Sequence, residues 1–89
     1  MTFTKDPDAT LDYVLDWTEW LGAFGDTIAT SSWTVPDGLV KVTESNTSVL
    51  ATVWLSGGTD GQAYSVTNRI TTVGGRADDR TIKIKVRNK

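Results

Sequence analysis

Polar and apolar residues alternate along most of this 89-residue chain, and this period of two limits its fold more than any other feature. In residues 11–17, leucine, tyrosine, leucine and tryptophan alternate with aspartate, valine and aspartate. In residues 81–86, isoleucine and valine alternate with threonine and lysine. Successive side chains of a strand point to opposite faces of a sheet, so each segment is predicted to be a half-buried strand. A helical spacing competes over residues 11–21, but the overall pattern predicts an all-β protein.

Turn signals divide the chain into six predicted strands, at residues 11–17, 27–35, 39–43, 48–55, 63–72 and 81–86. An irregular or one-turn segment follows the first strand, up to Leu21, and a seventh strand begins at Phe3 if the N-terminal residues also pair. Short strands separated by turns are typical of an immunoglobulin-like antiparallel β-sandwich of six to seven strands, with a small barrel as the alternative. We expect residues 1–10 to form an extended N-terminal arm and residues 11–89 to form a single β-sandwich domain.

Aromatic residues indicate where the core of this sandwich lies. Residues 48–55 are the most apolar run, which predicts a central strand covered on both faces. Trp33 and Trp54 are expected in the core, because both lie on well-patterned strands. Tyr64 stands at the corner from which a tyrosine of a sandwich domain hydrogen-bonds back to the backbone.

The residue types that are missing exclude several kinds of chemistry. The chain has no cysteine and no histidine, which excludes disulfides, thiolate nucleophiles, cysteine-based zinc sites and Ser-His-Asp catalysis. Asp16 and Glu19 lie near tryptophans, but a domain this small has little room for the cleft of a glycosidase. No apolar run reaches the roughly 20 residues that span a bilayer, and the N-terminus lacks the apolar region of a signal peptide. The sequence therefore predicts a soluble, non-enzymatic domain with no cofactor.

Two acidic pairs suggest calcium, Asp6 with Asp8 and Asp78 with Asp79, because calcium prefers hard oxygen ligands. Neither pair carries the rest of a calcium-binding loop, so no metal site is predicted. The first pair flanks Pro7, which favours an extended arm. The second lies in the turn predicted for residues 73–80, where aspartates cap backbone N–H groups and arginines pair with carboxylates.

Charge is divided unevenly between the two halves of the chain. Residues 1–44 hold eight acidic and two basic side chains, a net charge of −6, whereas residues 45–89 hold three acidic and seven basic side chains, a net charge of +4. The two halves can neutralise each other within a sheet, or copies can meet acidic end to basic end. The overall net charge of −2 disfavours nucleic-acid binding.

Surface contacts are the expected mode of action, and three groups of residues are candidates for them. Trp17 and Trp20 are three residues apart and would face opposite sides of a strand, so one is expected to cover the open end of the sandwich or to anchor a partner. The other candidates are the N-terminal arm and the tip of the last turn, since loops carry recognition. The predicted interface residues are Asp6, Asp8, Leu11, Trp17, Trp20, Arg76, Asp78, Asp79 and Arg80.

A further signal lies in the stretches Lys5–Tyr13, Asp16–Leu21, Asp26–Ala29, Trp33–Leu39, Tyr64–Thr72 and Gly75–Val86. As a set they resemble small tailed-bacteriophage virion proteins of the fiber-tail adaptor type, and the resemblance covers nearly the whole chain. It implies an immunoglobulin-like fold and a structural role, in which the protein attaches tail fibers or spikes to the tail by protein–protein contacts. One end would dock on the tail barrel, and the other would hold the N-terminal segment of a fiber.

The partners that this resemblance implies are phage tail proteins (adaptor or nozzle) and a tail fiber or spike, and copies of the chain could also associate in a symmetric ring. No nucleic-acid or membrane partner is expected. The protein would be made in the host cytoplasm and reside in the tail of the virion.

Three alternative functions remain open at the level of sequence. A capsid decoration (head cement) protein would use the same fold to bind across capsomers. A small carbohydrate-binding module would need exposed tryptophans on one face. A small nucleic-acid binder would need its basic residues to converge.

Overall fold

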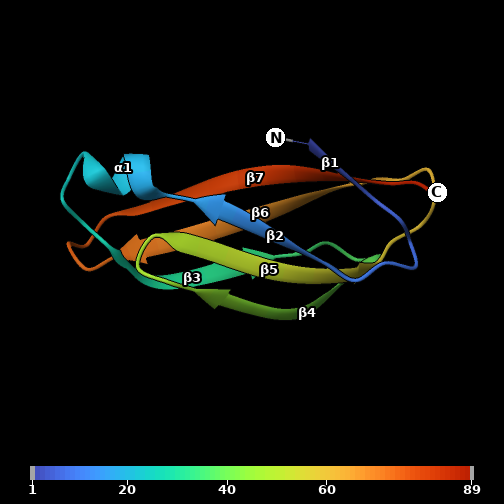
Figure 1. Cartoon of the computed structure of the whole chain (residues 1–89), viewed down its shortest axis with the longest axis horizontal. Helices are drawn as coiled ribbons and strands as arrows, with labels where there is room; N and C mark the ends of the chain where they lie inside the picture. The colour runs from blue at the N-terminus through green and yellow to red at the C-terminus, as the bar shows by residue number, and fades with distance from the viewer. Residues whose placement is uncertain (1, 89) are drawn as a thin grey trace.

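The computed structural model describes residues 2–88, which form seven strands and one short helix (Figure 1). The elements are β1 (Thr2–Lys5), β2 (Leu11–Asp16), α1 (Thr18–Gly22), β3 (Ile28–Thr34), β4 (Leu39–Asn46), β5 (Leu50–Gly57), β6 (Ala63–Thr72) and β7 (Ala77–Val86). They form an elongated body with principal extents of 42 × 20 × 17 Å. Within the described range, no helix is long and apolar enough to cross a membrane.

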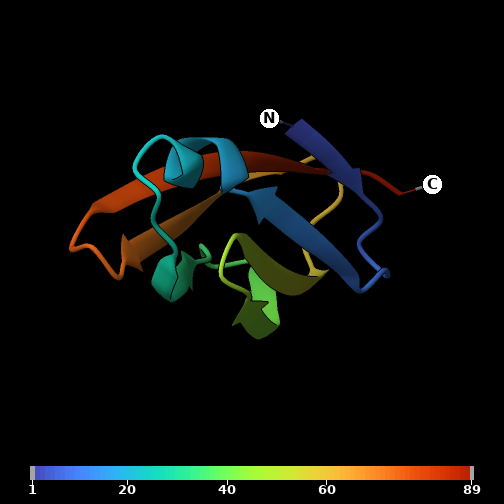
Figure 2. The same ribbon diagram turned by 60° about the vertical axis from the view of Figure 1, so that its left-hand side comes forward.

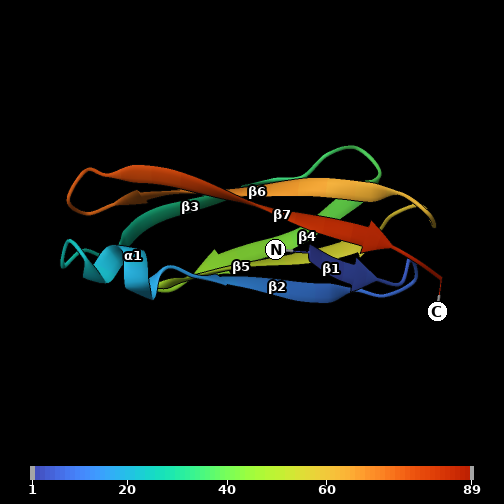
Figure 3. The same cartoon turned by 90° about the horizontal axis from the view of Figure 1, so that it is seen from above.

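The strands form two sheets that pack face to face, in the orders β1-β7-β6-β3 and β2-β5-β4 (Figure 3). The orders β7-β6-β3 and β2-β5-β4 correspond to strands G-F-C and B-E-D of an immunoglobulin domain. Neighbouring strands are antiparallel except for β1, which pairs in parallel with β7. The predicted all-β sandwich is confirmed, with the N-terminal strand as its seventh, but the sheet that contains β1 is mixed rather than antiparallel.

The core lies between the sheets and retains two features of immunoglobulin domains. Trp33 on β3 is buried as predicted and corresponds to the tryptophan on strand C of those domains. Tyr64 is the second residue of β6, and its hydroxyl accepts a hydrogen bond of 3.1 Å from the backbone N–H of Thr59, which confirms the predicted corner. The buried core residues are Tyr13, Leu15, Trp17, Leu21, Ile28, Trp33, Leu39, Ala51, Val53, Leu55, Val66, Ile70, Ile82, Ile84 and Val86.

Two strands are longer than the sequence predicted. β4 continues to Asn46, because Ser45 and Asn46 extend its ladder with β5 through the predicted turn. β7 begins at Ala77 rather than at residue 81, because the residues in between extend its ladder with β6. The predicted tip at residues 73–80 is therefore a short turn followed by strand.

The prediction that residues 48–55 form a strand covered on both faces is wrong. β5 is central, between β2 and β4, but only one of its faces packs against the other sheet. Val53 and Leu55 are fully buried, whereas Trp54 points outward and is 39% exposed instead of lying in the core. A sheet in a two-layer sandwich has one inner face. Because this strand is apolar on both faces, its sequence did not distinguish the inner face from the outer one.

A β-bulge also changes the faces of β3. Strict alternation placed Ile28 and Trp33 on opposite faces. The register with β6 shifts between Ile28 and Thr30, so that both Ile28 and Trp33 reach the core. One extra residue in a strand reverses the facing of everything beyond it.

The segment after the first strand forms a single helical turn, as predicted, rather than a helix that begins at residue 11. β2 ends at Asp16, and α1 begins after Trp17, whose carbonyl accepts a hydrogen bond of 2.9 Å from the N–H of Leu21. Leu21 is buried, so α1 covers the end of the sandwich with its apolar side. Figures 1 and 2 show α1 beside the β6–β7 turn, at the end of the molecule opposite the β1–β2 connection.

Candidate functional site

Four of the predicted interface residues meet at the α1 end of the sandwich. The guanidinium of Arg80 lies 4.0 Å from the centroid of the Trp17 ring, and Trp17 contacts Trp20 edge to face with centroids 5.5 Å apart. Trp20 contacts Phe24 in the same way at 5.5 Å, and the guanidinium of Arg76 lies 4.2 Å from the Phe24 ring. Cations are attracted to the faces of aromatic rings, and rings favour edge-to-face contacts. We call these five residues, from α1, its flanks, the β6–β7 turn and β7, the arginine–aromatic cluster.

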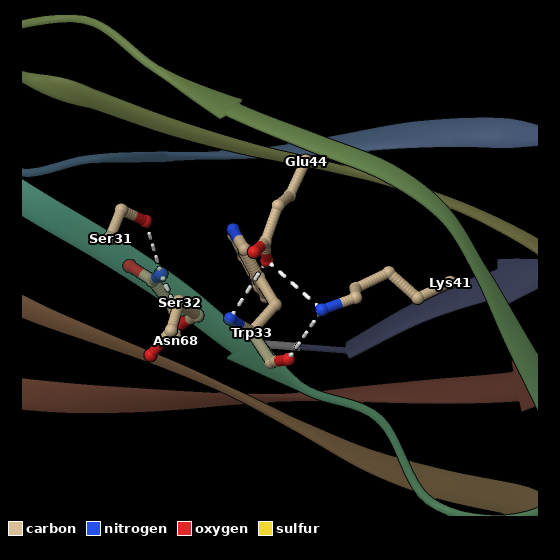
Figure 4. Close-up of polar contacts among 6 residues, drawn as sticks. All are labelled: Ser31, Ser32, Trp33, Lys41, Glu44 and Asn68. Carbon is tan, nitrogen blue, oxygen red and sulfur yellow. Dashed lines mark hydrogen bonds and ion pairs between the residues drawn. The ribbon is translucent and has the colours of Figure 1, made fainter.

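The cluster is anchored to the core through Trp17. The indole N–H of this fully buried residue donates a hydrogen bond of 3.0 Å to the side-chain oxygen of Asn68 on β6. The Asn68 amide nitrogen in turn donates to the Ser31 hydroxyl at 2.9 Å and to the Ser32 carbonyl at 3.0 Å (Figure 4). Asn68 is itself fully buried, and a buried polar group is stable only when it is hydrogen-bonded. The amide therefore connects α1 to β3 and fixes the position of the indole.

The outer members of the cluster are the ones that a partner can touch. Phe24 is 47% exposed, and the side chain of Arg76 is 44% exposed. Trp20 is half-buried, and Trp17 is covered by Arg80, whose guanidinium also donates to the Asp16 carbonyl at 3.2 Å. Of the two tryptophans predicted as interface residues, Trp17 is therefore buried beneath this surface, and Trp20 is the partly exposed one. The sequence analysis did not select Phe24, although an exposed phenylalanine in a glycine-flanked loop was the available signal.

Asp26 holds Arg76 in place at this end of the molecule. One of its carboxylate oxygens pairs with the Arg76 guanidinium at 3.1 Å, and the other accepts the N–H groups of Thr27 at 2.9 Å and Gly74 at 3.0 Å. A hydrogen bond from the Thr72 side chain is the largest of the influences that lower the Asp26 pKa to about 2, while desolvation opposes them. The charged carboxylate therefore links the start of β3 to the β6–β7 turn.

Acid should release this link. Because the folded-state pKa of Asp26 lies below its usual value near 3.8, the stabilisation is complete above pH of about 4 and is lost as pH falls towards 2. We expect Asp26→Asn to show a smaller loss of thermal stability between pH 4 and 2 than the wild type. Asp37→Asn, which removes a turn carboxylate with no recorded side-chain partner in residues 2–88, is the control and should follow the wild type. Equal pH dependence of the wild type and Asp26→Asn would contradict this role.

The two remaining residues of the predicted tip lie on β7 rather than in a loop. Asp79 forms an ion pair of 3.5 Å with Arg69 across the β6–β7 ladder, and both side chains are more than half exposed. The carboxylate of Asp78 accepts the N–H of Asp79 at 2.8 Å. The pair does not converge on a common site with other acids. Across residues 2–88, no three acidic side chains gather in a way that could hold a metal ion.

The predicted contacts of the N-terminal segment lie at the opposite end of the molecule (Figure 1). The fully buried Lys5 donates from its ammonium to the carbonyls of Asp6 and Gly57, both at 2.8 Å, which fastens β1 to the end of β5. Burial is the main cause that lowers the Lys5 pKa, and the charges of Asp6 and Asp8 oppose it. Asp8 is exposed, and Leu11 is 40% exposed. This end therefore presents an acidic connection with an apolar residue beside it.

The β3 edge of the larger sheet is partly closed by side chains of β4. Glu44 accepts the backbone N–H of Trp33 at 3.0 Å, and the Lys41 ammonium lies 3.4 Å from both the Glu44 carboxylate and the Trp33 carbonyl (Figure 4). Side chains that occupy edge groups oppose the addition of a further strand. Contacts with partners are therefore expected at the two ends and on the outer faces rather than along β3.

The arrangement suits protein contacts better than binding of a small ligand. A shallow hollow of about 260 Å³ lies near the C-terminal end, and its lining includes Asp60, Gln62 and Lys85. It is separate from the arginine–aromatic cluster. Trp17 and Trp33 are buried, so the several exposed tryptophans that a carbohydrate-binding module would need are not together on one face.

Comparison with protein families gives a match over most of this chain. A family model described as Podophage GP4 fiber-tail adaptor protein gp77 matches residues 5–85, which include every residue of both ends described above. None of the curated proteins matches the chain.

Proposed function

This chain belongs to the podophage fiber-tail adaptor family, and on that premise we propose that it joins a fiber to the tail through contacts made by its two ends. The family indicates a structural role in the phage virion. The proposal adds that the protein acts without catalysis, is made in the host cytoplasm, and binds a tail protein of the adaptor or nozzle on one side and a fiber or spike on the other. Copies arranged in a symmetric ring around the tail are part of the same proposal.

The observation that carries this proposal is the separation of two different surfaces along a 42 Å body. The α1 end presents Phe24 and Arg76, an aromatic and a cation of the kinds enriched at interface hot spots. The opposite end presents Asp8 and Leu11, an acid and an aliphatic residue. Two chemically different surfaces, held apart by a rigid sandwich, support simultaneous contact with two different partners.

The choice of variants follows from the way each end is built. Arg80 is a poor target, because it covers Trp17 and its loss would disturb the core as well as the surface. Phe24→Ser with Arg76→Ser changes the exposed part of the α1 end, and Asp8→Ser with Leu11→Ser changes the exposed part of the other. Ser32→Ala, at an exposed position of the edge strand β3 between the two ends, is the control.

We expect the two double variants to change the composition of purified particles in different ways. The variant changed at the end that binds the tail should reduce the amount of this chain relative to the portal protein by at least about tenfold. The variant changed at the end that binds the fiber should leave this chain in place and reduce the fiber, relative to the portal protein, to a similar extent. Quantitative mass spectrometry of particles made with each variant measures both ratios, and thermal unfolding of the isolated variants checks folding. Wild-type ratios for both double variants, or the same pattern of chain and fiber loss in both, would contradict the proposal.

A further inference from the structure

The outer face of the β2-β5-β4 sheet carries an apolar patch that the two ends do not explain. Trp54 on β5 pairs directly with Asp12 on β2 and with Thr43 on β4. Residues paired across a sheet point to the same face, so an indole and a carboxylate stand side by side on the outside. Val14 is 44% exposed and Val40 is 56% exposed on the same strands. We call this surface the Trp54 face.

The charge of the Trp54 face is negative. Asp12 and Asp16 both alternate with the buried residues of β2 and therefore point outward. The one cation of the three strands, Lys41, is directed to Glu44 and to the edge of β3. An indole ring next to a carboxylate attracts a lysine or arginine, which can form a cation–π contact and an ion pair together.

The outer face of β6 and β7 has the complementary chemistry. Lys83 and Lys85 alternate with the buried isoleucines of β7 and point outward, and within residues 2–88 neither has a recorded ion-pair partner. Thr2 and Ser65 pair beside Lys83, and small side chains also flank Lys85 on both sides. The two lysine ammonium groups therefore project from a surface whose neighbouring side chains are small. Because the two sheets form separate layers, this face and the Trp54 face look in opposite directions (Figure 3).

We infer that the Trp54 face binds the β6–β7 face of a second copy of this chain, with Lys83 and Lys85 against Trp54 and Asp12. The contact joins two different surfaces, so each copy keeps one free face and the contact repeats from copy to copy. Closure of such a series gives a ring. The inference needs several copies to be neighbours, as the proposed function provides, but the contact itself requires neither tail nor fiber.

The small size of the face limits the strength of the contact. Three strands about 4.8 Å apart and about 26 Å long cover roughly 400 Å². That area is about half of the roughly 800 Å² that each partner of a standard interface buries. The isolated protein should therefore associate with a Kd of about 0.1–1 mM, and the contact should become effective where copies are held together.

Sedimentation analysis of the isolated full chain at concentrations up to about 1 mM tests the inference. The wild type should associate as concentration rises, and added salt should weaken the association. Trp54→Ser, Asp12→Lys and the double variant Lys83→Glu/Lys85→Glu should each weaken it by at least about tenfold. Val73→Ser, exposed on the β6–β7 turn and outside both faces, should behave as the wild type. Circular dichroism and thermal unfolding verify that the variants are folded.

A mixing experiment separates this geometry from every other kind of association. Trp54→Ser retains the lysine face, and Lys83→Glu/Lys85→Glu retains the Trp54 face. Mixed in equal amounts, the two should form a dimer that does not grow further, although each alone stays monomeric. A mixture that stays monomeric, or a wild type that is monomeric at about 1 mM, would overturn the inference and leave the Trp54 face to a different protein. Either result would leave the adaptor proposal untouched, since that proposal is tested on particles.

Discussion

Replacement of Trp17 by alanine is expected to lower the free energy of unfolding by about 3–5 kcal/mol, as for other fully buried aromatic residues. Trp17 has no exposed surface, and it contacts Trp20 and Arg80 on one side and Asn68 on the other. A chain of this length is stable by only about 4–13 kcal/mol. The midpoint of thermal unfolding should fall by more than about 12 °C, measured by circular dichroism or calorimetry.

Two further variants separate the part of this loss of unfolding free energy that is due to burial of the Trp17 ring. Trp54→Ala removes the same side chain from an exposed position and should cost about 1 kcal/mol or less. Trp17→Phe keeps a ring but leaves the Asn68 oxygen without its donor, which should cost about 1–3 kcal/mol. If Trp17→Ala and Trp54→Ala destabilise the protein equally, the assignment of Trp17 to the core is wrong.

Burial of Trp17 also changes how the α1 end must be probed. Arg80 rests on the indole from outside, so a substitution of Arg80 acts on the core as well as on the surface. Phe24 and Arg76 form the outer part of the same cluster and are not required to cover a core residue. A loss of particle assembly on changing Phe24 and Arg76 is evidence for contact once thermal unfolding shows that loss of the Asp26–Arg76 ion pair leaves the domain folded.

The sequence predicted the elements of the fold well because each has a local cause. Isoleucine and valine alternate with lysine along β7, and this alternation alone identifies its inner face. Tyr64 was placed at its corner from its position between a glycine-rich loop and a strand. The single turn after Asp16 followed from the end of the alternating pattern. In each case the information lies within about ten neighbouring residues.

The errors arose where the outcome depends on packing between distant segments. Trp54 was expected in the core because β5 is apolar on both faces, and only the position of the second sheet decides which face is covered. Ile28 reached the core through a bulge that strict alternation does not reveal.

The candidate site could be predicted only in part for the same reason. Trp17, Trp20, Arg76 and Arg80 were each selected separately, but their contact requires β7 of one sheet to meet the segment that follows β2 of the other. Asn68, which holds Trp17 from below, had no distinguishing local signal beyond a polar residue on an inner face. Phe24 was not selected, because its contact with Arg76 joins residues that are far apart in the sequence.

The second large effect is expected at Gly58, where alanine should lower the free energy of unfolding by about 2–5 kcal/mol. Gly58 has φ of +100°, a conformation that side chains rarely tolerate. A Cβ atom there would lie 2.6 Å from a methyl group of Val86 and 3.2 Å from one of Leu39, both buried in the core. Strain and overpacking therefore add at this position.

Gly61→Ala is the matched control for Gly58→Ala, because the same loop holds Gly61 at φ of +85° with nothing within 4 Å of its Cβ position. It should cost only the backbone strain, about 1–2 kcal/mol. Gly58 also follows the carbonyl that Lys5 holds, so a shift of this turn should loosen β1. Hydrogen exchange should then show faster exchange of the β1 amides in Gly58→Ala than in Gly61→Ala. Equal destabilisation and equal exchange in the two variants would mean that the turn yields without disturbing the core, and that the N-terminal end does not depend on it.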